Sequence, residues 1–193
     1  GGFDIPLLLA CRSTHLMTGL GGFGGRTLRK GDVLELGHAS ESQCANMNNV
    51  EGILKQLNRN TIRVTKGLEG DWFTDDAWDS FLNNQFSVSQ TFSRMGIRLE
   101  GNSIESSAGH EIVTQGVPLG AVQVPGNGQP IISFVEHQTT GGYPRIANVI
   151  SADLCKVGQL KPGDRFFFAL VSMAEAEQLY AEQMNIIHNL SAL

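Results

Sequence analysis

The feature of this sequence that most limits its possible folds is a series of short apolar or alternating runs separated by turn-forming residues. Each run has the length of a β-strand, and Gly, Pro or Asn separates one from the next. A period of two places every second side chain on one face of a strand, whereas an amphipathic helix needs apolar residues three and four apart. The runs lie at Thr61 to Thr65, at Phe86, Val88 and Phe92 around Gln90, and at Ile97 to Leu99, Ala121 to Val124, Ile131 to Val135 and Phe166 to Val171. The sequence therefore predicts a chain made mainly of β-strands.

Two similar turns each precede a strand candidate. Arg29-Lys30-Gly31-Asp32 stands before Val33 to Leu36, and Lys161-Pro162-Gly163-Asp164 stands before Arg165 to Phe168. Gly, Pro and Asp are residues that tight turns favour, so we expect each segment to turn into a strand. The polar stretch Gly37 to Asn49 is expected to be an exposed connection.

Helical signals are fewer. Thr74 can cap a helix whose apolar residues (Ala77, Trp78, Phe81 and Leu82) share one face. Ser172 and Glu175 form a capping box, and an apolar stripe follows at Ala176, Leu179, Tyr180, Met184, Ile187 and Leu190. Ala152 to Val157 is a third, shorter candidate. Many strands with two or three short helices predict a closed or strongly curved β structure with the helices at its ends.

Composition excludes several classes of protein. With 193 residues, 41% of them hydrophobic, the chain can bury a core, and we expect one domain over residues 1–193. The net charge of -5 argues against nucleic acid as a partner, and no apolar run approaches the roughly 18 residues of a membrane span. Three distant cysteines (Cys11, Cys44 and Cys155) without a C-x-x-C pair predict neither a disulfide framework nor a zinc site. We expect a cytoplasmic protein, and the low charged fraction of 17% indicates a surface that meets another subunit.

Gly19 to Gly24 formally satisfies the G-x-G-x-x-G pattern of dinucleotide-binding proteins. That interpretation needs a strand before the glycines and a helix after them. The sequence continues instead into the turn that ends at Asp32. We therefore interpret the segment as a glycine-rich loop with left-handed or closely packed backbone.

The segment Gln138 to Pro144 is the strongest candidate for a site. It places an amide, two hydroxyls, a glycine pair and a phenol (Gln138, Thr139, Thr140, Gly141, Gly142 and Tyr143) directly after an apolar run. Such a loop can present backbone N–H groups and neutral donors to an anion or a carbonyl oxygen. The alternative is a turn whose polar side chains bond to their own backbone.

Arg94 and Arg98 form a second candidate. In an extended segment they share one face, where they can hold a carboxylate or a phosphate, and Gly96 between them allows a close approach. The alternative is two solvated arginines in surface ion pairs.

Two isolated residues complete the candidates. Gln123, on a short strand between two Pro-Gly loops, is either an inward-facing recognition group or a barrel residue with its hydrogen bonds satisfied. His137 adjoins the Gln138 segment and is the one histidine we would test as an acid or base. We find no metal-ligand motif and no motif that specifies a nucleophile.

Several segments together resemble the KipA family, which is also known as the C-type 5-oxoprolinase subunits, as allophanate hydrolase subunit 2 or as the biotin-dependent carboxyltransferase domain. They are the early Gly-Gly-Phe-Asp-Ile-Pro, Arg12-Ser13-Thr14, Gly21 to Arg26, Ser87 to Ser89 with Arg94 to Leu99, Gly116 to Ile132, and Gln138 to Ile146 with Ala152-Asp153-Leu154. The resemblance reaches to about Ala176. Family members usually carry roughly a hundred residues more before this point, so we expect the C-terminal portion of a longer family member.

The resemblance implies a cyclophilin-like β-barrel and a hydrolase subunit that works only in a hetero-oligomer. The expected partners are a KipI-like subunit, of the B type in 5-oxoprolinase, and a third oxoprolinase subunit. Together these convert 5-oxo-L-proline to L-glutamate with ATP, which is bound through the complex. Two alternatives are a regulatory module that antagonises a KipI-like kinase inhibitor, and a carboxyltransferase that uses carboxybiotin to act on urea or a similar small amide.

The resemblance also carries site roles onto matching residues. Gln138, Thr139, Thr140, Tyr143 and His137 are expected at the catalytic centre, with the loop polarising a carbonyl. Arg94, Arg98, Gln123, Gly141 and Gly142 are expected to bind a small substrate or anion. The chain departs from the family pattern at Leu68, Ser93, Gln115 and His137, where a proline, an acid or amide, a glutamate and an arginine are usual.

Overall fold

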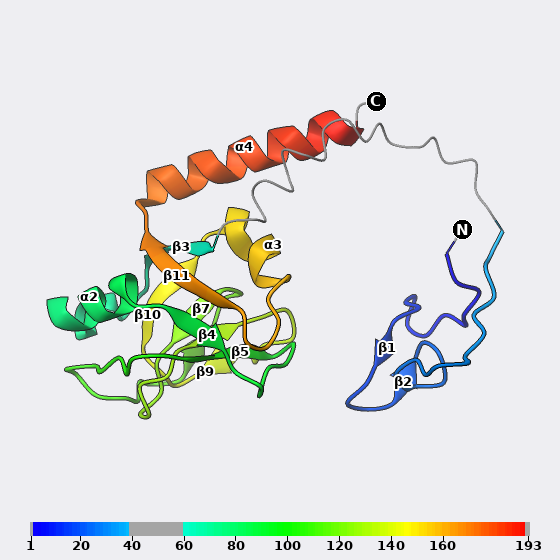
Figure 1. Cartoon of the computed structure of the whole chain (residues 1–193), viewed down its shortest axis with the longest axis horizontal. Helices are drawn as coiled ribbons and strands as arrows, with labels where there is room; N and C mark the ends of the chain where they lie inside the picture. The colour runs from blue at the N-terminus through cyan, green and yellow to red at the C-terminus, as the bar shows by residue number, and fades with distance from the viewer. Residues whose placement is uncertain (1, 39–59, 192–193) are drawn as a thin grey trace. The chain divides into compact units, whose positions relative to one another are not determined.

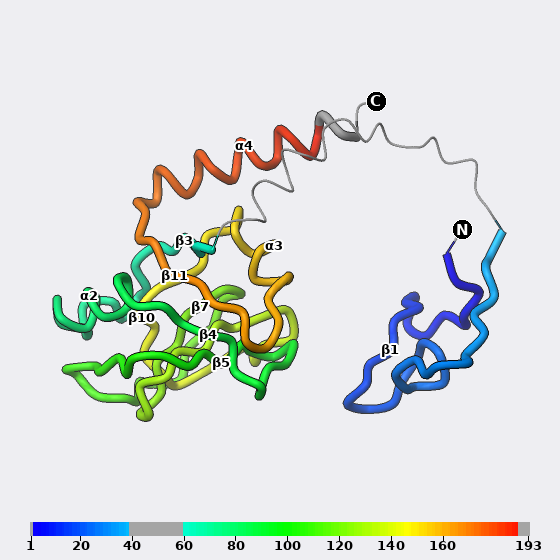
Figure 2. Tube along the Cα trace, viewed as in Figure 1, coloured from blue at the N-terminus to red at the C-terminus, as the bar shows by residue number. Residues whose placement is uncertain are grey.

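The computed structural model describes residues 2–38 and 60–191, so most of the expected connection Gly37 to Asn49 lies outside the described residues. The chain divides into two compact units, Gly1–Cys44 and Ala45–Leu193. Residues 2–38 of the first unit hold a small hairpin, β1 (Thr14–His15) with β2 (Leu20–Gly21), drawn in blue in Figures 1 and 2. The expectation of one domain over residues 1–193 stays a prediction.

A glycine-rich turn extends the hairpin of the first unit. Gly21, Gly22, Gly24 and Gly25 have φ values between +56° and +67°, a region that side chains with a Cβ rarely adopt. A Cβ on Gly25 would lie 2.0 Å from the Gly19 carbonyl oxygen. Residues 2–38 contain no helix. The left-handed loop interpretation is therefore confirmed, and the dinucleotide pattern is a coincidence of spacing.

The two similar turns have the same hydrogen bonds. In each, the first residue's N–H donates to the Asp carboxylate, at 2.7 Å in Arg29–Asp32 and 3.1 Å in Lys161–Asp164. The Asp N–H donates back to the first residue's carbonyl, at 3.1 and 3.0 Å. Both tight turns are confirmed, but only the second leads into a strand, because residues 33–36 make only an isolated bridge between Leu36 and Phe3.

Seven strands of the second unit close into a barrel in the order β10-β3-β11-β4-β5-β8-β7. Their bounds are β3 Thr61–Lys66, β4 Phe86–Val88, β5 Gly96–Glu100, β7 Ala121–Gln123, β8 Ile131–Ser133, β10 Arg145–Val149 and β11 Arg165–Leu170. All neighbours are antiparallel except β3 and β11, which run parallel. Figure 1 shows these strands wrapped around one core. The predicted mainly-β barrel is confirmed.

Three described α-helices accompany the barrel: α2 (Asp75–Asn83), α3 (Leu154–Val157) and α4 (Met173–Ser191). Two 3₁₀ turns, η2 (Gly70–Trp72) and η3 (Ser151–Asp153), complete the elements outside the strands. The Thr74 hydroxyl accepts an N–H at 3.3 Å, and the Ser172 hydroxyl accepts one from Glu175 at 3.2 Å. Both predicted caps are confirmed. None of the helices in the described part of the chain is long and apolar enough to cross a membrane.

Alternation along the strands decides which side chains fill the barrel. In β3, Ile62 and Val64 are buried, as the period of two predicts. In β11, Phe168 is buried while its neighbour Phe167 is 38% exposed. Phe168 stacks on Phe81 of α2, with ring centroids 4.4 Å apart. The apolar face of α2 thus closes over the aromatic part of the core.

Two predicted strands extend too far. β4 ends at Val88 and leaves Phe92 outside, and β8 ends at Ser133 and leaves Val135 exposed. Local hydrogen bonds turn the chain away in both places, for example from the His137 N–H to the Phe134 carbonyl at 2.7 Å. The helix α4, with 19 residues, is longer than the short helices we expect. Its apolar stripe is buried at Ala176 near its start, whereas Tyr180 and Ile187 are exposed, and the side chain of Leu190 lies outside the described residues.

Candidate substrate-binding site

A two-stranded ribbon carries the Gln138–Tyr143 segment, which we call the site loop. The ribbon pairs β6 (Gln115–Gly116) with β9 (Thr140–Gly141). Two more backbone hydrogen bonds extend it, from Val117 N–H to Thr139 O at 3.0 Å and from Ile112 N–H to Gly142 O at 2.8 Å. The site loop is therefore held by the backbone, which leaves its side chains free for other contacts.

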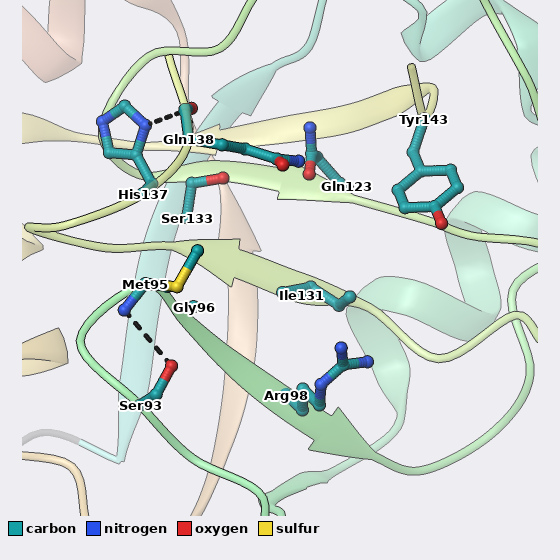
Figure 3. Close-up of a pocket in the computed structure, with 10 residues that line it drawn as sticks. All are labelled: Ser93, Met95, Gly96, Arg98, Gln123, Ile131, Ser133, His137, Gln138 and Tyr143. Carbon is teal, nitrogen blue, oxygen red and sulfur yellow. Dashed lines mark hydrogen bonds between the residues drawn. The ribbon is translucent and has the colours of Figure 1, made fainter. Parts of the chain in front are cut away.

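Gln123, the last residue of β7, lies under the site loop. Its side chain is buried, at 4% exposure, and its Nε2 has no hydrogen-bond partner. A Cβ built on Gly141 would lie 2.9 Å from Gln123 Nε2 and 3.4 Å from Gln138 Nε2. The two amide nitrogens, which we call the amide pair, therefore converge beside Gly141, where Figure 3 shows the two side chains meeting. The buried Gln123 Nε2, with no partner within the protein, and the nearby Gln138 Nε2 are donors suited to an oxygen atom of a ligand.

The amide pair opens into a cavity of about 340 Å³. Its walls come from β5, β7 and β8, the turn before β5 and the site loop: Ser93, Met95, Gly96, Arg98, Gln123, Ile131, Ser133, His137, Gln138 and Tyr143. In Figure 3 the guanidinium of Arg98 lies apart from the amide pair, so the cavity has neutral donors in one region and a cation in another. Ser133, buried and next to the donors, is a lining residue that the sequence interpretation missed.

A second hollow, of about 410 Å³, lies against the site loop and shares Gln138 and Tyr143 with the first. Thr140, Gly141 and Gly142 line this hollow, while Thr139 uses its carbonyl in the ribbon. The structure therefore brings most of the predicted loop residues to the walls of these two adjoining hollows.

The two predicted arginines are in different environments. Arg98 lies on the exposed face of β5 and lines the cavity. Arg94 lies before β5, and its Nε is 2.9 Å from a carboxylate oxygen of Glu136. Arg94 is not among the lining residues. The strand starts too late for the shared face that the sequence predicts, so only Arg98 is placed to meet a ligand in this cavity.

His137 contributes one ring nitrogen to the loop backbone. Its Nδ1 lies 2.8 Å from the carbonyl oxygen of Gln138, and because a carbonyl only accepts, Nδ1 carries the hydrogen. In the neutral ring Nε2 is then the nitrogen without a hydrogen, and the residue lines the cavity. Within the described ranges, no three His, Cys, Asp or Glu residues are grouped to hold a metal ion.

A buried ion pair that the sequence interpretation missed lies behind the ribbon. Glu69 and Arg145 are each 6% exposed. The Glu69 carboxylate accepts from the Arg145 backbone N–H (3.0 Å), Nε (3.0 Å) and Nη2 (3.2 Å), and also from Gln115 Nε2. Arg145 Nη1 donates to the Gly116 carbonyl at 3.0 Å. An arginine at the start of a buried strand was the only sign of this pair in the sequence.

Charge pairing outweighs burial at Glu69. Burial raises the pKa of this carboxyl group, but the hydrogen bonds from Arg145 lower it, and the pKa lies below its usual value. Glu69 is therefore ionised at neutral pH and is not a proton donor there.

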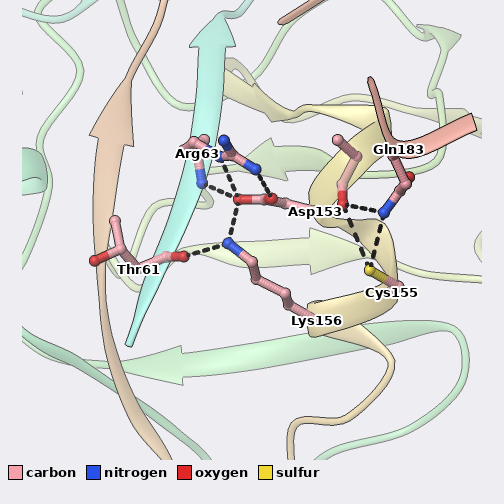
Figure 4. Close-up of polar contacts among 7 residues, drawn as sticks. Thr61, Arg63, Asp153, Cys155, Lys156 and Gln183 are labelled. Atoms are coloured by element: carbon pink, nitrogen blue, oxygen red, sulfur yellow. Dashed lines mark hydrogen bonds and ion pairs between the residues drawn. The ribbon is translucent and has the colours of Figure 1, made fainter. Parts of the chain in front are cut away.

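A second buried network lies elsewhere in the barrel and does not line the cavity (Figure 4). Asp153 of η3 is completely buried and accepts from the backbone and guanidinium of Arg63 and from Lys156 Nζ at 2.8 Å. Lys156 also donates to the Thr61 carbonyl at 3.0 Å. Gln183 of α4 donates to the Ala152 carbonyl at 2.9 Å. These contacts join β3 to the helical segment, and we assign them to stability.

A family model described as the carboxyltransferase domain, subdomain A and B, matches residues 1–170. The chain is 36% identical to the C-type 5-oxoprolinase subunit of Escherichia coli K12, over 95% of this chain and 60% of that protein. It is also 36% identical to the protein of the same name from Haemophilus influenzae, over 93% of this chain and 56% of that protein. The chain thus spans about 60% of the length of these relatives.

Solved structures show the same similarity. The crystal structure of the Kluyveromyces lactis urea amidolyase matches with a TM-score of 0.76 and 32% identity. The match covers 98% of this chain and 13% of that much longer one.

Proposed function

The chain belongs to the carboxyltransferase-domain family, subdomains A and B, and on that basis we propose that it is part of an ATP-dependent 5-oxoprolinase complex, as one of its subunits. The reaction is the opening of 5-oxo-L-proline to L-glutamate. The similarity to two proteins named as C-type 5-oxoprolinase subunits supports this assignment. A KipI-like subunit and a third subunit complete the proposed complex, and ATP is bound through the complex.

The observation that carries the proposal is the amide pair, which leaves buried Gln123 Nε2 without an acceptor. 5-Oxoproline has a ring amide carbonyl and a carboxylate. In the proposed complex the carbonyl oxygen accepts hydrogen bonds from Gln123 and Gln138, and the carboxylate pairs with Arg98 across the cavity. The protein thus supplies one cation for the substrate's carboxylate and two neutral donors for its carbonyl oxygen.

The same donors suit the chemistry of ring opening. Attack of a water molecule on the amide carbon forms a new C–O bond and moves negative charge onto the carbonyl oxygen, and donors fixed beside that oxygen stabilise the charge. The ring C–N bond then breaks, and the nitrogen gains a proton to become the amino group of glutamate. His137, with Nε2 as its basic nitrogen, is the proposed residue for proton transfer. Thr139, Thr140 and Tyr143 shape the loop and its two hollows.

The partner surface is proposed at the site loop. Gln138, Thr139 and Thr140 are exposed, and Tyr143 is 38% exposed. A KipI-like subunit seated over this loop would exclude water from the amide pair and strengthen its hydrogen bonds.

The test is glutamate release from 5-oxoproline by the full-length protein, co-purified with its KipI-like neighbour and supplied with the third subunit. We expect release that requires ATP and all three components. Gln123→Leu should reduce kcat/KM at least tenfold, because Leu has similar bulk and no donor. A well-formed complex that releases no glutamate would refute the proposal.

Carboxyl transfer is the second candidate, favoured by the match of nearly the whole chain to the urea amidolyase structure. The amide pair can hold the carbonyl of urea or of a carboxylated biotin in the same way. This activity needs biotin on a separate carrier, so a biotin-dependent carboxylation of urea by the complex, with no glutamate release, would favour it.

A further inference from the structure

The Glu69–Arg145 ion pair lies between the strand of Gln123 and the strand that pairs with the site loop. Arg145 lies directly opposite Gln123 in the pairing of β10 with β7. It also donates through Nη1 to the Gly116 carbonyl in β6, at 3.0 Å. Because β6 pairs with β9, the guanidinium is one strand away from Gly141 and the site loop.

A register shift places Arg145 at this junction. β10 pairs regularly with β7 at Ala147 and Asn148, and the register changes between Arg145 and Ala147. Bulges of this kind re-aim a side chain and are common beside active sites. The backbone approaches closely here, since a Cβ on Gly67 would lie 2.3 Å from the Arg145 carbonyl oxygen. The carboxylate of Glu69 then fixes the guanidinium from the far side.

Gln115 links the ion pair to the ribbon a second time. Its side-chain amide donates to Glu69 Oε1, and its backbone is part of β6. The carboxylate therefore holds the strand of Gln123 through Arg145 and the strand facing the site loop through Gln115. Neither Glu69 nor Arg145 is among the residues that line the two hollows.

We propose that the Glu69–Arg145 ion pair is a positioning device that fixes the distance between Gln123 and Gln138. The statement that this distance serves 5-oxoproline rests on the function proposed above. A buried ion pair generally adds no more stability than apolar residues of the same size would. What it adds is fixed geometry, since a guanidinium with bonds to a carboxylate and to a carbonyl has one orientation.

The test compares Glu69→Gln and Gln115→Ala with Asp153→Asn in the full-length protein. Asp153 is the matched control because it is also a buried acid paired with an arginine, but it lies in the other network. The first measurement is amide hydrogen exchange at Ile112 and Val117, whose N–H groups hold the site loop, with Leu99 in the barrel as the reference. The second is the kcat for glutamate release and the KM for ATP, measured in the complex.

We expect Glu69→Gln and Gln115→Ala to speed exchange at Ile112 and Val117 at least tenfold more than at Leu99. We also expect kcat to fall at least tenfold while the KM for ATP is unchanged. Asp153→Asn should show no preference for the loop amides. If Glu69→Gln does not fold, Gln115→Ala alone tests the proposal. The Gln115 side chain makes only one of the hydrogen bonds to Glu69, so its removal leaves the ion pair with Arg145 in place.

Equal acceleration at all three amides, or the same loop-specific acceleration in Asp153→Asn, would overturn the proposal. A normal kcat in variants with a loosened loop would also overturn it. If the wild-type complex releases no glutamate, the proposed function fails by itself, and the exchange measurements alone decide whether the pair positions the loop.

Discussion

Gln123 combines deep burial with an amide nitrogen that has no partner. Leaving a buried donor unsatisfied costs about 1–3 kcal/mol, so such groups are rare and usually have a reason. The neighbouring residue is Gly141, which has room for the acceptor because it has no side chain. At the scale of single residues, the site therefore depends on the unfilled position beside Gly141, where a ligand oxygen can accept a hydrogen bond from Gln123.

Filling that space should weaken substrate binding without unfolding the ribbon. In Gly141→Ala the new methyl group would lie 2.9 Å from both Gln123 Nε2 and Val117 Cγ2. We expect kcat/KM for 5-oxoproline to fall at least tenfold, which is about 1.4 kcal/mol. Gly116→Ala on the facing strand is the control, because a Cβ there meets nothing within 4 Å. Equal losses in the two variants would contradict the assignment of the acceptor position.

The two arginines should differ in their contribution. Arg98→Ala removes a charge-assisted hydrogen bond to the substrate carboxylate, worth about 1.5–3 kcal/mol, so kcat/KM should fall roughly 10- to 150-fold. Arg94→Ala removes only a surface ion pair with Glu136 and should change little. Steady-state kinetics of both variants in the complex provide the check. A larger loss of kcat/KM in Arg94→Ala than in Arg98→Ala would instead mean that Arg94 binds the substrate carboxylate.

Within strand β11, two adjacent phenylalanines provide a test of the barrel core. Phe168 is buried against Phe81, whereas Phe167 is 38% exposed. Phe168→Ala should lower the free energy of unfolding by about 3–5 kcal/mol. Phe167→Ala should lower it by much less, because little apolar area returns to water. Urea denaturation monitored by circular dichroism measures both, and an equal or larger loss in Phe167→Ala would contradict this orientation of β11.

The elements were predictable where a local pattern decided them. Alternation located the strands, and the side chains of Thr74 and Ser172 located two helix starts. Strand ends were not predictable at Phe92 and Val135, where short-range hydrogen bonds compete with pairing. The Glu69–Arg145 pair was also missed. Its partners are 76 positions apart in the chain, and only the closed barrel brings them together.

In the candidate site, too, features set by a local sequence pattern were predictable, whereas features set by contacts between distant segments were not. The loop residues Gln138 to Tyr143 were found because polar and glycine residues gather in one segment. That Gln123 faces this loop depends on the pairing of β7 with β10. Likewise, the absence of Arg94 from the cavity depends on where β5 begins.

At the scale of the whole molecule, buried carboxylates link stability to pH. Burial raises the pKa of Asp153, but hydrogen bonds from Arg63 and Lys156 lower it, so the folded pKa lies below its usual value. The stabilisation is therefore complete above the unfolded pKa of about 3.9 and is lost as the pH falls through the folded value.

Asp153→Asn removes this dependence together with the ion pairs. At pH 7 we expect the variant to be less stable by about 3–5 kcal/mol, because Arg63 and Lys156 remain buried without a carboxylate. The difference from wild type should narrow below pH about 4, where protonation of Asp153 has the same effect as the substitution. Urea denaturation at a series of pH values tests this, and a constant difference down to pH 3 would exclude the linkage.

The strand order also governs how the molecule is made. β3, the first strand of the barrel in the chain, lies between β10 and β11, the last two. Its second neighbour is complete only at Leu170, and during synthesis on the ribosome it has neither neighbour until the chain reaches Arg145–Val149 of β10. Until then Ile62 and Val64 have no core to enter, and the nascent chain offers an unpaired apolar strand to chaperones. The closure of this barrel is thus a late, single event in translation.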